Sequence, residues 1–375
     1  MEVSVSEEDL KAANREVGVD YDAMDPFKRM CQEYGVKTAG LIGRLGLKEA
    51  EWSRGESAHV IEFPDHYIAF TIEGLGTKNL VADMYATNGQ ESFYGAVAQC
   101  NAAMVLNDLI TVGALPVDFG LHVVAGSGDW FKDGEHPNAL AMGTHTAMNE
   151  SGTCWGCGET PTLPGMADPK TVILSGAAWG LVRPKEKLIR GNVEDGDAIV
   201  LLGSSGIHAN GLSVARKIAS KLPRSYETKL PSGQSFGRRL LTPTRLYCKM
   251  IEACQKRDIT IHYAVNITGH GWAKLMRLKE PFVYEISSVP DPQEEFLFMQ
   301  ERGKFSDREM YYTFNMGAGF ALYVPGEDVH YVLSAASDLG IPAWNAGVIR
   351  KDGDRKEVLI RPKDVRFGAE DLAVR

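Results

Sequence analysis

Residues 203–211 read GSSGIHANG and directly follow the apolar run AIVLL at 198–202. A buried strand that ends in a glycine- and serine-rich loop before a helix is typical of an α/β domain. We expect Asn210 to cap this helix, which should extend to about Lys221. A helix N-terminus preceded by small residues can bind an anion, and His208 could there bind, protonate or orient a substrate group. The alternative is a simple capping turn whose histidine is exposed.

A second glycine-flanked histidine follows a later strand, in Thr268-Gly269-His270-Gly271. Two such loops after two strands of one domain predict a shared pocket. Because histidine resists dihedral angles that glycine accepts, His270 should have a negative φ or carry strain that function supports.

Composition limits the possible functions. The 375 residues are 44% hydrophobic, with a formal net charge of -9 and a pI near 5.6. This length favours two domains, and the acidic balance argues against a nucleic-acid or anionic-membrane surface. We expect a cytoplasmic protein, because the sequence has no membrane-length apolar run and its N-terminus is acidic. Six scattered cysteines fit reduced thiols.

Strands alternate with helical stretches in both halves of the chain, which predicts two α/β or α+β domains. The expected division is an N-terminal arm at 1–50, one domain at 51–190 and a second at 191–375. The boundary falls in the charged stretch RPKEKLIRGNVEDGD. We expect CWGCGETPTLPGM to be a turn-rich connection and MYYTFN to be a loop.

The loop Glu73-Gly74-Leu75-Gly76-Thr77-Lys78-Asn79 follows a predicted strand. Backbone amides freed by glycine, together with a lysine, can bind phosphate oxygens, and a carboxylate beside them can hold Mg²⁺. The spacing is not that of a P-loop, so a tight turn with exposed charge is the alternative.

Two further places carry acidic groups. Asn107 and Asp108 interrupt an apolar helix predicted at 91–112, where Asp108 is either a metal ligand or a helix-terminal carboxylate with a local partner. Glu159 lies in a proline-framed stretch, as a metal ligand or as an exposed turn residue. The neighbouring Cys154 and Cys157 are expected to be free thiols, because no second metal-binding pair accompanies them.

Several segments in order resemble the aminoimidazole ribonucleotide synthetases, which are the phosphoribosylformylglycinamidine cyclo-ligases. They are EGLGTK, NDL, GETPTLPGM, GSSGIHANGLSVARKI, LLTPTRLYCKM and MYYTFNMGAGFAL. The resemblance extends from about residue 18 to residue 349.

This resemblance implies a two-domain fold in which N-terminal strands of two subunits form a shared barrel, with a C-terminal α/β domain against it. It also implies a homodimer that uses ATP and Mg²⁺ to close the imidazole ring of a small ribonucleotide. The formyl-amide oxygen would be phosphorylated, the amidine-side nitrogen would attack that carbon, and phosphate would leave.

By the same resemblance, each candidate residue receives a role. The catalytic candidates are His208, Lys78 and His270. The ATP-binding candidates are Gly74, Gly76, Thr77, Lys78, Asn107, Asp108 and Asn315. The substrate-binding candidates are Ser204, Ser205, Asn210, Thr268 and Gly269. The metal candidates are Glu73, Asp108 and Glu159.

The sequence departs from the family pattern mainly in its first half. Glu73 stands in place of an aspartate, Cys100 in place of an acidic residue, and Thr162 and Leu163 in place of a Glu-Met pair. His270 interrupts a run of three glycines. Cation binding is therefore the property that these departures affect most. Two other hypotheses remain: another ATP-using enzyme, such as a small-molecule kinase, and a non-catalytic dimeric nucleotide-binding protein.

Overall fold

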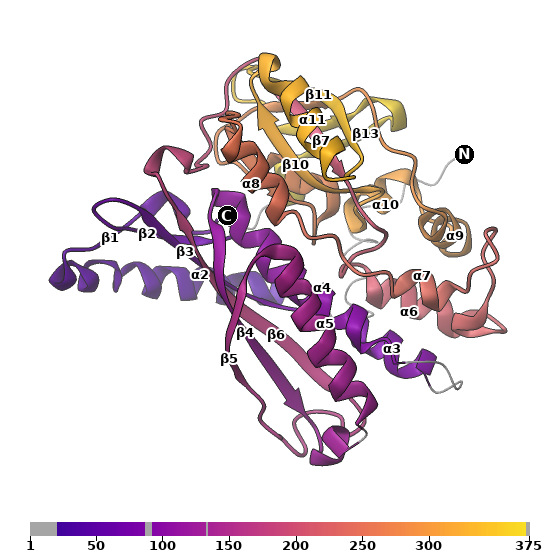
Figure 1. The fold of residues 1–375 in the computed structure, drawn as a ribbon. Helices are drawn as coiled ribbons and strands as arrows, with labels where there is room; N and C mark the ends of the chain where they lie inside the picture. The colour runs from indigo at the N-terminus through magenta and orange to yellow at the C-terminus, as the bar shows by residue number, and fades with distance from the viewer. Residues whose placement is uncertain (1–20, 87–91, 133, 373–375) are drawn as a thin grey trace.

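The computed structural model describes residues 21–86, 92–132 and 134–372, which form two sheets with helices packed on them (Figure 1). The first sheet has the strand order β1-β2-β3-β6-β4-β5. Its strands are β1 (Lys48–Glu49), β2 (His59–Glu62), β3 (Tyr67–Gly74), β4 (Leu115–Ala125), β5 (Cys154–Glu159) and β6 (Val172–Val182). The helices of this half are α2 (Tyr21–Val36), α3 (Lys78–Ala86), α4 (Tyr94–Leu109) and α5 (Glu135–Ser151).

The second sheet has the order β13-β12-β9-β11-β7-β10-β8. Its strands are β7 (Ala198–Gly203), β8 (Tyr263–Asn266), β9 (Val283–Ile286), β10 (Ala318–Val324), β11 (Ala343–Arg350), β12 (Glu357–Ile360) and β13 (Val365–Gly368). The helices are α6 (Leu212–Lys221), α7 (Phe236–Leu240), α8 (Cys248–Lys256), α9 (Glu294–Gly303), α10 (Asp307–Thr313) and α11 (Val329–Asp338). A 3₁₀ helix, η7 (Gly271–Met276), follows β8.

Burial patterns along the strands show which faces are covered. Every residue of β7 and β10 is buried, as expected of central strands with elements packed on both faces. In β6, buried residues alternate with exposed or half-buried ones, so the first sheet has one covered face. Helices α4 and α5 cover that face (Figure 1).

The opposite face of the first sheet exposes large apolar side chains. They are Phe70 and Ile72 of β3 and Ile173 and Trp179 of β6. Phe70 pairs with Trp179 across the two strands, and the four side chains lie on the same uncovered face, where they form an apolar strip.

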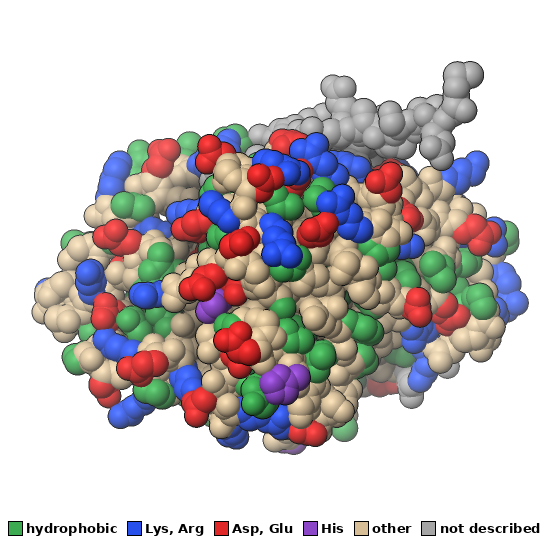
Figure 2. Space-filling view, turned by 90° about the horizontal axis from the view of Figure 1, so that it is seen from above, with side chains coloured by type: hydrophobic (Ala, Val, Ile, Leu, Met, Phe, Trp, Pro, Cys, Tyr) green, Lys and Arg blue, Asp and Glu red, His purple; other side chains and the backbone are tan. Residues whose placement is uncertain are grey.

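Figure 2 shows acidic and basic side chains interspersed over the face of the molecule seen from above, with apolar groups between them. Among the described residues, no helix is long and apolar enough to cross a membrane.

Four local predictions are wrong. CWGCGE is a strand, β5, which pairs in parallel with β4 at the sheet edge. MYYT belongs to α10, because Ser306 and Glu309 form a capping box that starts this helix. Gly211, with φ 77°, is the N-cap of α6 instead of Asn210. The sequence PTRLYCKMIEACQK also predicts a helix over its whole length, but the helix begins only at Cys248. Residues 1–20 of the expected N-terminal arm lie outside the described residues.

Helices α4 and α5 approach most closely where glycines face each other. A Cβ built on Gly143 of α5 would lie 2.2 Å from the carbonyl oxygen of Gly95 in α4. Gly143→Ala should therefore force the helices apart and lower the free energy of unfolding by about 1–3 kcal/mol. Urea denaturation measures this change. Gly128→Ala is the control, because nothing lies within 4 Å of its added Cβ, and an equal loss there would contradict the packing argument.

Candidate functional site

The loop that follows β7 is buried and has an unusual backbone. Gly206 has φ 153° and His208 has φ 60°. A left-handed conformation is rare for histidine and needs support from its surroundings. His208 is only 2% exposed, which excludes the exposed capping histidine that the sequence allowed.

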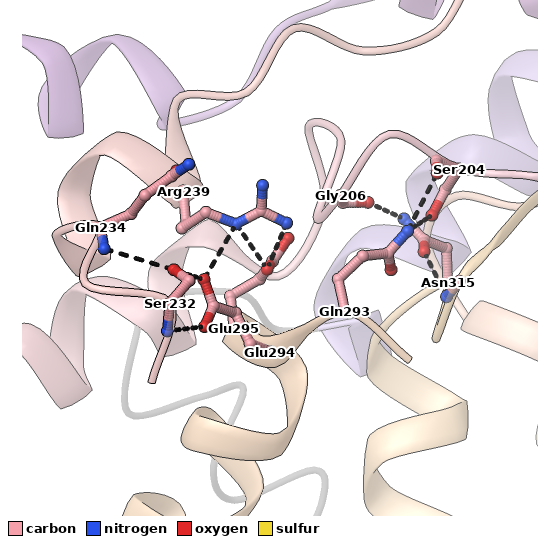
Figure 3. A network of polar contacts seen from close by, with 10 residues as sticks. Ser204, Gly206, Ser232, Gln234, Arg239, Gln293, Glu294, Glu295 and Asn315 are labelled. Carbon is pink, nitrogen blue, oxygen red and sulfur yellow. Dashed lines mark hydrogen bonds and ion pairs between the residues drawn. The ribbon is translucent and has the colours of Figure 1, made fainter. Parts of the chain in front are cut away.

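Two side chains from other segments and one backbone carbonyl hold this loop, and Figure 3 shows the two side chains, Asn315 and Gln293. Asn315 Nδ2 donates to the Gly206 carbonyl at 2.8 Å, and Gln293 Nε2 donates to the Ser204 carbonyl at 2.9 Å. Ser205 Oγ donates to the Pro243 carbonyl at 2.5 Å. The loop is therefore fixed by hydrogen bonds at successive residues.

His208 is a neutral side chain inside this loop. Burial lowers its pKa from 6.5 to about 3, and the nearby cations Lys78 and Arg245 contribute in the same direction. The Ser205 N–H donates to His208 Nε2 at 3.2 Å. The ring proton is accordingly assigned to Nδ1.

Lys78 joins the two halves of the chain. It is the first residue of α3 and is fully buried. Its ammonium donates to the carbonyl oxygens of His208 and Thr242, each at 2.7 Å. In the structure, Lys78 thus binds backbone carbonyls of the second half, and its predicted contact with ATP stays a prediction.

Helix α4 binds the extended segment that precedes α8, residues 242–247. Asn107 Nδ2 donates to the Arg245 carbonyl at 2.9 Å, and Asn107 Oδ1 accepts the Tyr247 N–H at 3.0 Å. The Thr244 N–H points to Cys100 Sγ at 3.2 Å. These bonds explain why PTRLY does not join the helix, and they give Asn107 and Cys100 a role that spacing did not predict.

Two acidic side chains lie close together where β3, α4 and β8 meet. Burial and the neighbouring Asp108 raise the pKa of Glu73 to about 7, while Lys274 and Arg277 oppose this shift. Asp108 Oδ1 accepts a hydrogen bond from Asn266 Nδ2 at 2.8 Å. The partner of Asp108 is thus Asn266, 158 residues away in sequence, and not a local group of its own helix. The role of Asp108 as a metal ligand stays a prediction.

The third predicted metal ligand lies elsewhere. Glu159 ends β5 and pairs with His122 of β4, whereas Glu73 pairs with Gly176 of β6. With β6 and β4 between them, β3 and β5 lie about 14 Å apart at ordinary strand spacing. Within the described parts of the chain, no three His, Cys, Asp or Glu side chains are placed to share a metal ion. The expected set Glu73, Asp108 and Glu159 does not form one magnesium site here.

The predicted loops do meet one another. A Cβ on Gly76 would lie 3.9 Å from the Ala209 carbonyl oxygen, and one on Gly269 would lie 4.0 Å from Asn210 Oδ1. Thr77 is half-buried in the same turn as Gly76, and Gly74 ends β3. The loops at 73–78, 203–211 and 268–270 therefore border one region.

His270 differs from the first expectation for its backbone. Its φ is 68°, so the backbone is left-handed at the start of η7, and the expected negative φ is wrong. The other expectation, backbone strain that function supports, stays a prediction. The ring is half-buried and packs edge-on against Tyr312, with centroids 6.0 Å apart. The ring of His208 instead contacts that of Tyr247, with centroids 6.5 Å apart.

An ion pair that was not predicted from the sequence lies beside the 203–211 loop. Glu295, in the first turn of α9, is fully buried and accepts hydrogen bonds from Arg239 Nε and Nη2 at 3.0 and 2.8 Å (Figure 3). Burial raises the pKa of this carboxyl group. The only sequence feature that could have indicated Glu295 is its position near a helix start, where acidic residues are common.

A pocket of about 320 Å³ opens beside the same 242–247 segment. Its lining includes Phe93, Arg238, Thr242 and Pro243. Its volume is at the lower end of the range for small-molecule sites.

Comparison with known proteins agrees with this geometry. A family model described as "AIR synthase related protein, N-terminal domain" matches residues 55–182, and the corresponding C-terminal domain matches 194–360. The chain is 35% identical over 313 residues to the phosphoribosylformylglycinamidine cyclo-ligase of Methanocaldococcus jannaschii, covering 82% of this chain and 86% of that protein. The corresponding enzyme of Methanothermobacter thermautotrophicus is 36% identical, covering 81% and 87%.

Solved structures share the fold at low sequence identity. The HypE–HypF complex matches with a TM-score of 0.59 and 14% identity, covering 85% of this chain and 94% of that chain. AaThiL complexed with AMPPCP and TMP matches with a TM-score of 0.58 and 15% identity, covering 83% and 89%. Both domain matches and the two relatives above 30% identity place the chain in the AIR synthase related protein family.

Proposed function

We propose that this protein is a phosphoribosylformylglycinamidine cyclo-ligase, which closes the imidazole ring of aminoimidazole ribonucleotide with ATP. The observation that carries the proposal is the identity of about 35% to cyclo-ligases over more than four-fifths of both chains. The meeting of the loops at 73–78, 203–211 and 268–270 in one region supports it. The family-model boundaries also support a division into domains near residue 190.

ATP is the proposed co-substrate. Solved structures of the same fold are complexes with AMPPCP, ATP or ADP. We assign nucleotide contacts to the loop at Gly74, Gly76 and Thr77, whose glycines leave room for phosphate oxygens. Lys78 would anchor the end of this loop to the second half of the chain, because the Lys78 ammonium is already bonded to two carbonyls there.

The chemistry needs oriented groups more than a nucleophile on the protein. The formyl-amide oxygen takes the γ-phosphoryl group of ATP, the amidine-side nitrogen attacks the activated carbon, and the carbon–oxygen bond breaks to release phosphate. Magnesium, when bound with ATP, would neutralise phosphate charge. We derive no step from a magnesium ion held by the protein alone, because Glu159 lies apart from Glu73 and Asp108.

His208 is proposed to position the loop and not to transfer a proton. A group with a pKa of about 3 stays neutral throughout the working pH range of a typical enzyme. Its carbonyl binds Lys78 and its ring accepts the Ser205 N–H, so both ends of the residue fix the loop. Ser204, Ser205, Asn210, Thr268 and Gly269 remain the proposed substrate contacts.

A homodimer through the first sheet is the proposed assembly. The uncovered strip of Phe70, Ile72, Ile173 and Trp179 supports it, because monomeric proteins rarely expose such a continuous apolar surface. A cytoplasmic location is proposed as well, since the six cysteines are free thiols.

Turnover tests the activity and the role of His208 together. We expect wild type to convert formylglycinamidine ribonucleotide and ATP to aminoimidazole ribonucleotide and ADP, measured by coupled ADP release. His208→Ala should lower kcat/KM by about 10- to 100-fold, because the loop loses its bond to Ser205. His208→Asn should retain more activity, since asparagine tolerates a positive φ and can accept the same N–H.

The pH dependence separates positioning from proton transfer. Burial lowers the pKa of His208, so the folded state stays neutral while the unfolded chain takes up a proton below pH 6.5. The free energy of unfolding should thus fall as the pH is lowered from 6.5 toward 3, and His208→Asn should make that fall smaller.

The rate profile is the second measurement. A step in wild-type kcat/KM near pH 6.5 that disappears in His208→Asn would show proton transfer and contradict the proposal.

The assembly is tested by one charge on the apolar strip. Ile72, 68% exposed, should bury in the dimer, so Ile72→Glu should shift the mass by light scattering from about twice 41.1 kDa to one chain. Leu297→Glu is the matched control, because Leu297 of α9 is 52% exposed and away from the sheet face. A wild-type monomer, or a dimer in Ile72→Glu, would refute the proposed interface.

A further inference from the structure

Lys274 lies beside the carboxylates where the family resemblance placed a metal ion. It belongs to η7, and its Nζ donates to Thr268 Oγ1 at 2.6 Å. Asp108 is bonded to Asn266, two residues before Thr268 in the same segment. These two hydrogen bonds therefore place the Lys274 ammonium and the Asp108 carboxylate at the same short segment, residues 266–268.

Charges from three elements face one another at this place. Glu73 comes from the end of β3, Asp108 from α4, and Lys274 and Arg277 from η7 and the residue after it. The like charge of Asp108 raises the pKa of Glu73, whereas the cations Lys274 and Arg277 lower it. Arg277 is also engaged by the first half of the chain, since its Nη2 donates to the Gly55 carbonyl at 2.7 Å.

Lys274 is held in place by its own helix. Trp272, Ala273, Leu275 and Met276 are fully buried, and Lys274 itself is 7% exposed. Because the residues on both sides of Lys274 are buried, its ammonium can move away only if this part of the core unpacks. The positive charge is thus a permanent part of the site, unlike an exchangeable ion.

We propose that Lys274 supplies, beside Glu73 and Asp108, the positive charge that a protein-bound divalent cation would otherwise supply. The inference rests on the proposed function, because it concerns how that site balances its charge. It also agrees with one departure from the family pattern: the third acidic position has become Cys100, and the remaining acids, Glu73 and Asp108, lie beside the cations Lys274 and Arg277. A divalent cation brought near this pair would meet the like charge of Lys274 at close range.

The test uses Mn²⁺ as the probe and the full chain without nucleotide, so it does not depend on turnover. Titration calorimetry and electron paramagnetic resonance count the bound ions. We expect wild type and Lys274→Arg to bind no Mn²⁺ in a Glu73-dependent manner, because both keep the cation. Lys274→Met, of similar volume, should gain one Mn²⁺ per chain, and Lys274→Met with Glu73→Gln should lose it again.

Two results would overturn the inference. One is a folded Lys274→Met protein with no Glu73-dependent Mn²⁺ site. The other is a wild-type Mn²⁺ site that Glu73→Gln removes, a measurement that needs no Lys274 variant to fold. Absence of turnover with formylglycinamidine ribonucleotide would refute the proposed activity and leave the Mn²⁺ counts to decide this inference separately.

Discussion

The arrangement of the site depends on the buried ammonium of Lys78. Burying a charge is costly unless the charge is bonded, and Lys78 satisfies two of its donors with the carbonyls of His208 and Thr242. Those carbonyls belong to the two segments of the second half that border the site. One side chain from the first half is therefore bonded to both segments.

The bonds around Lys78 make the strained loop possible. A left-handed His208 needs compensation, which comes from Asn315, Gln293 and the Ser205 N–H, whose acceptors are Gly206, Ser204 and His208. On the other side, Asn107 and Cys100 hold the 242–247 segment in an extended form. The polar residues of the family resemblance thus act first on the backbone, and ligand contact would fall to the glycines and hydroxyls that this backbone presents.

Local pattern predicted the elements whose neighbours are close in sequence. AIVLLG was read correctly as a buried strand from its continuous apolar run, and the small-residue helix was placed correctly at α4. CWGCGE was missed because glycine and cysteine carry little strand signal at an exposed sheet edge. The acceptors of Lys78 lie 130 and 164 residues away in sequence, so no local pattern could identify them. The partner of Glu295 and the cation beside Glu73 were hidden for the same reason.

Amide hydrogen exchange of Lys78→Met tests most directly whether this one residue organises both segments. We expect faster exchange in 203–211 and in 242–247 together, with the rest of the second sheet unchanged. Lys132→Met is the control, since Lys132 is 79% exposed and pairs with Asp129, three residues before it. Unchanged exchange in both segments of a folded Lys78→Met protein would contradict the account.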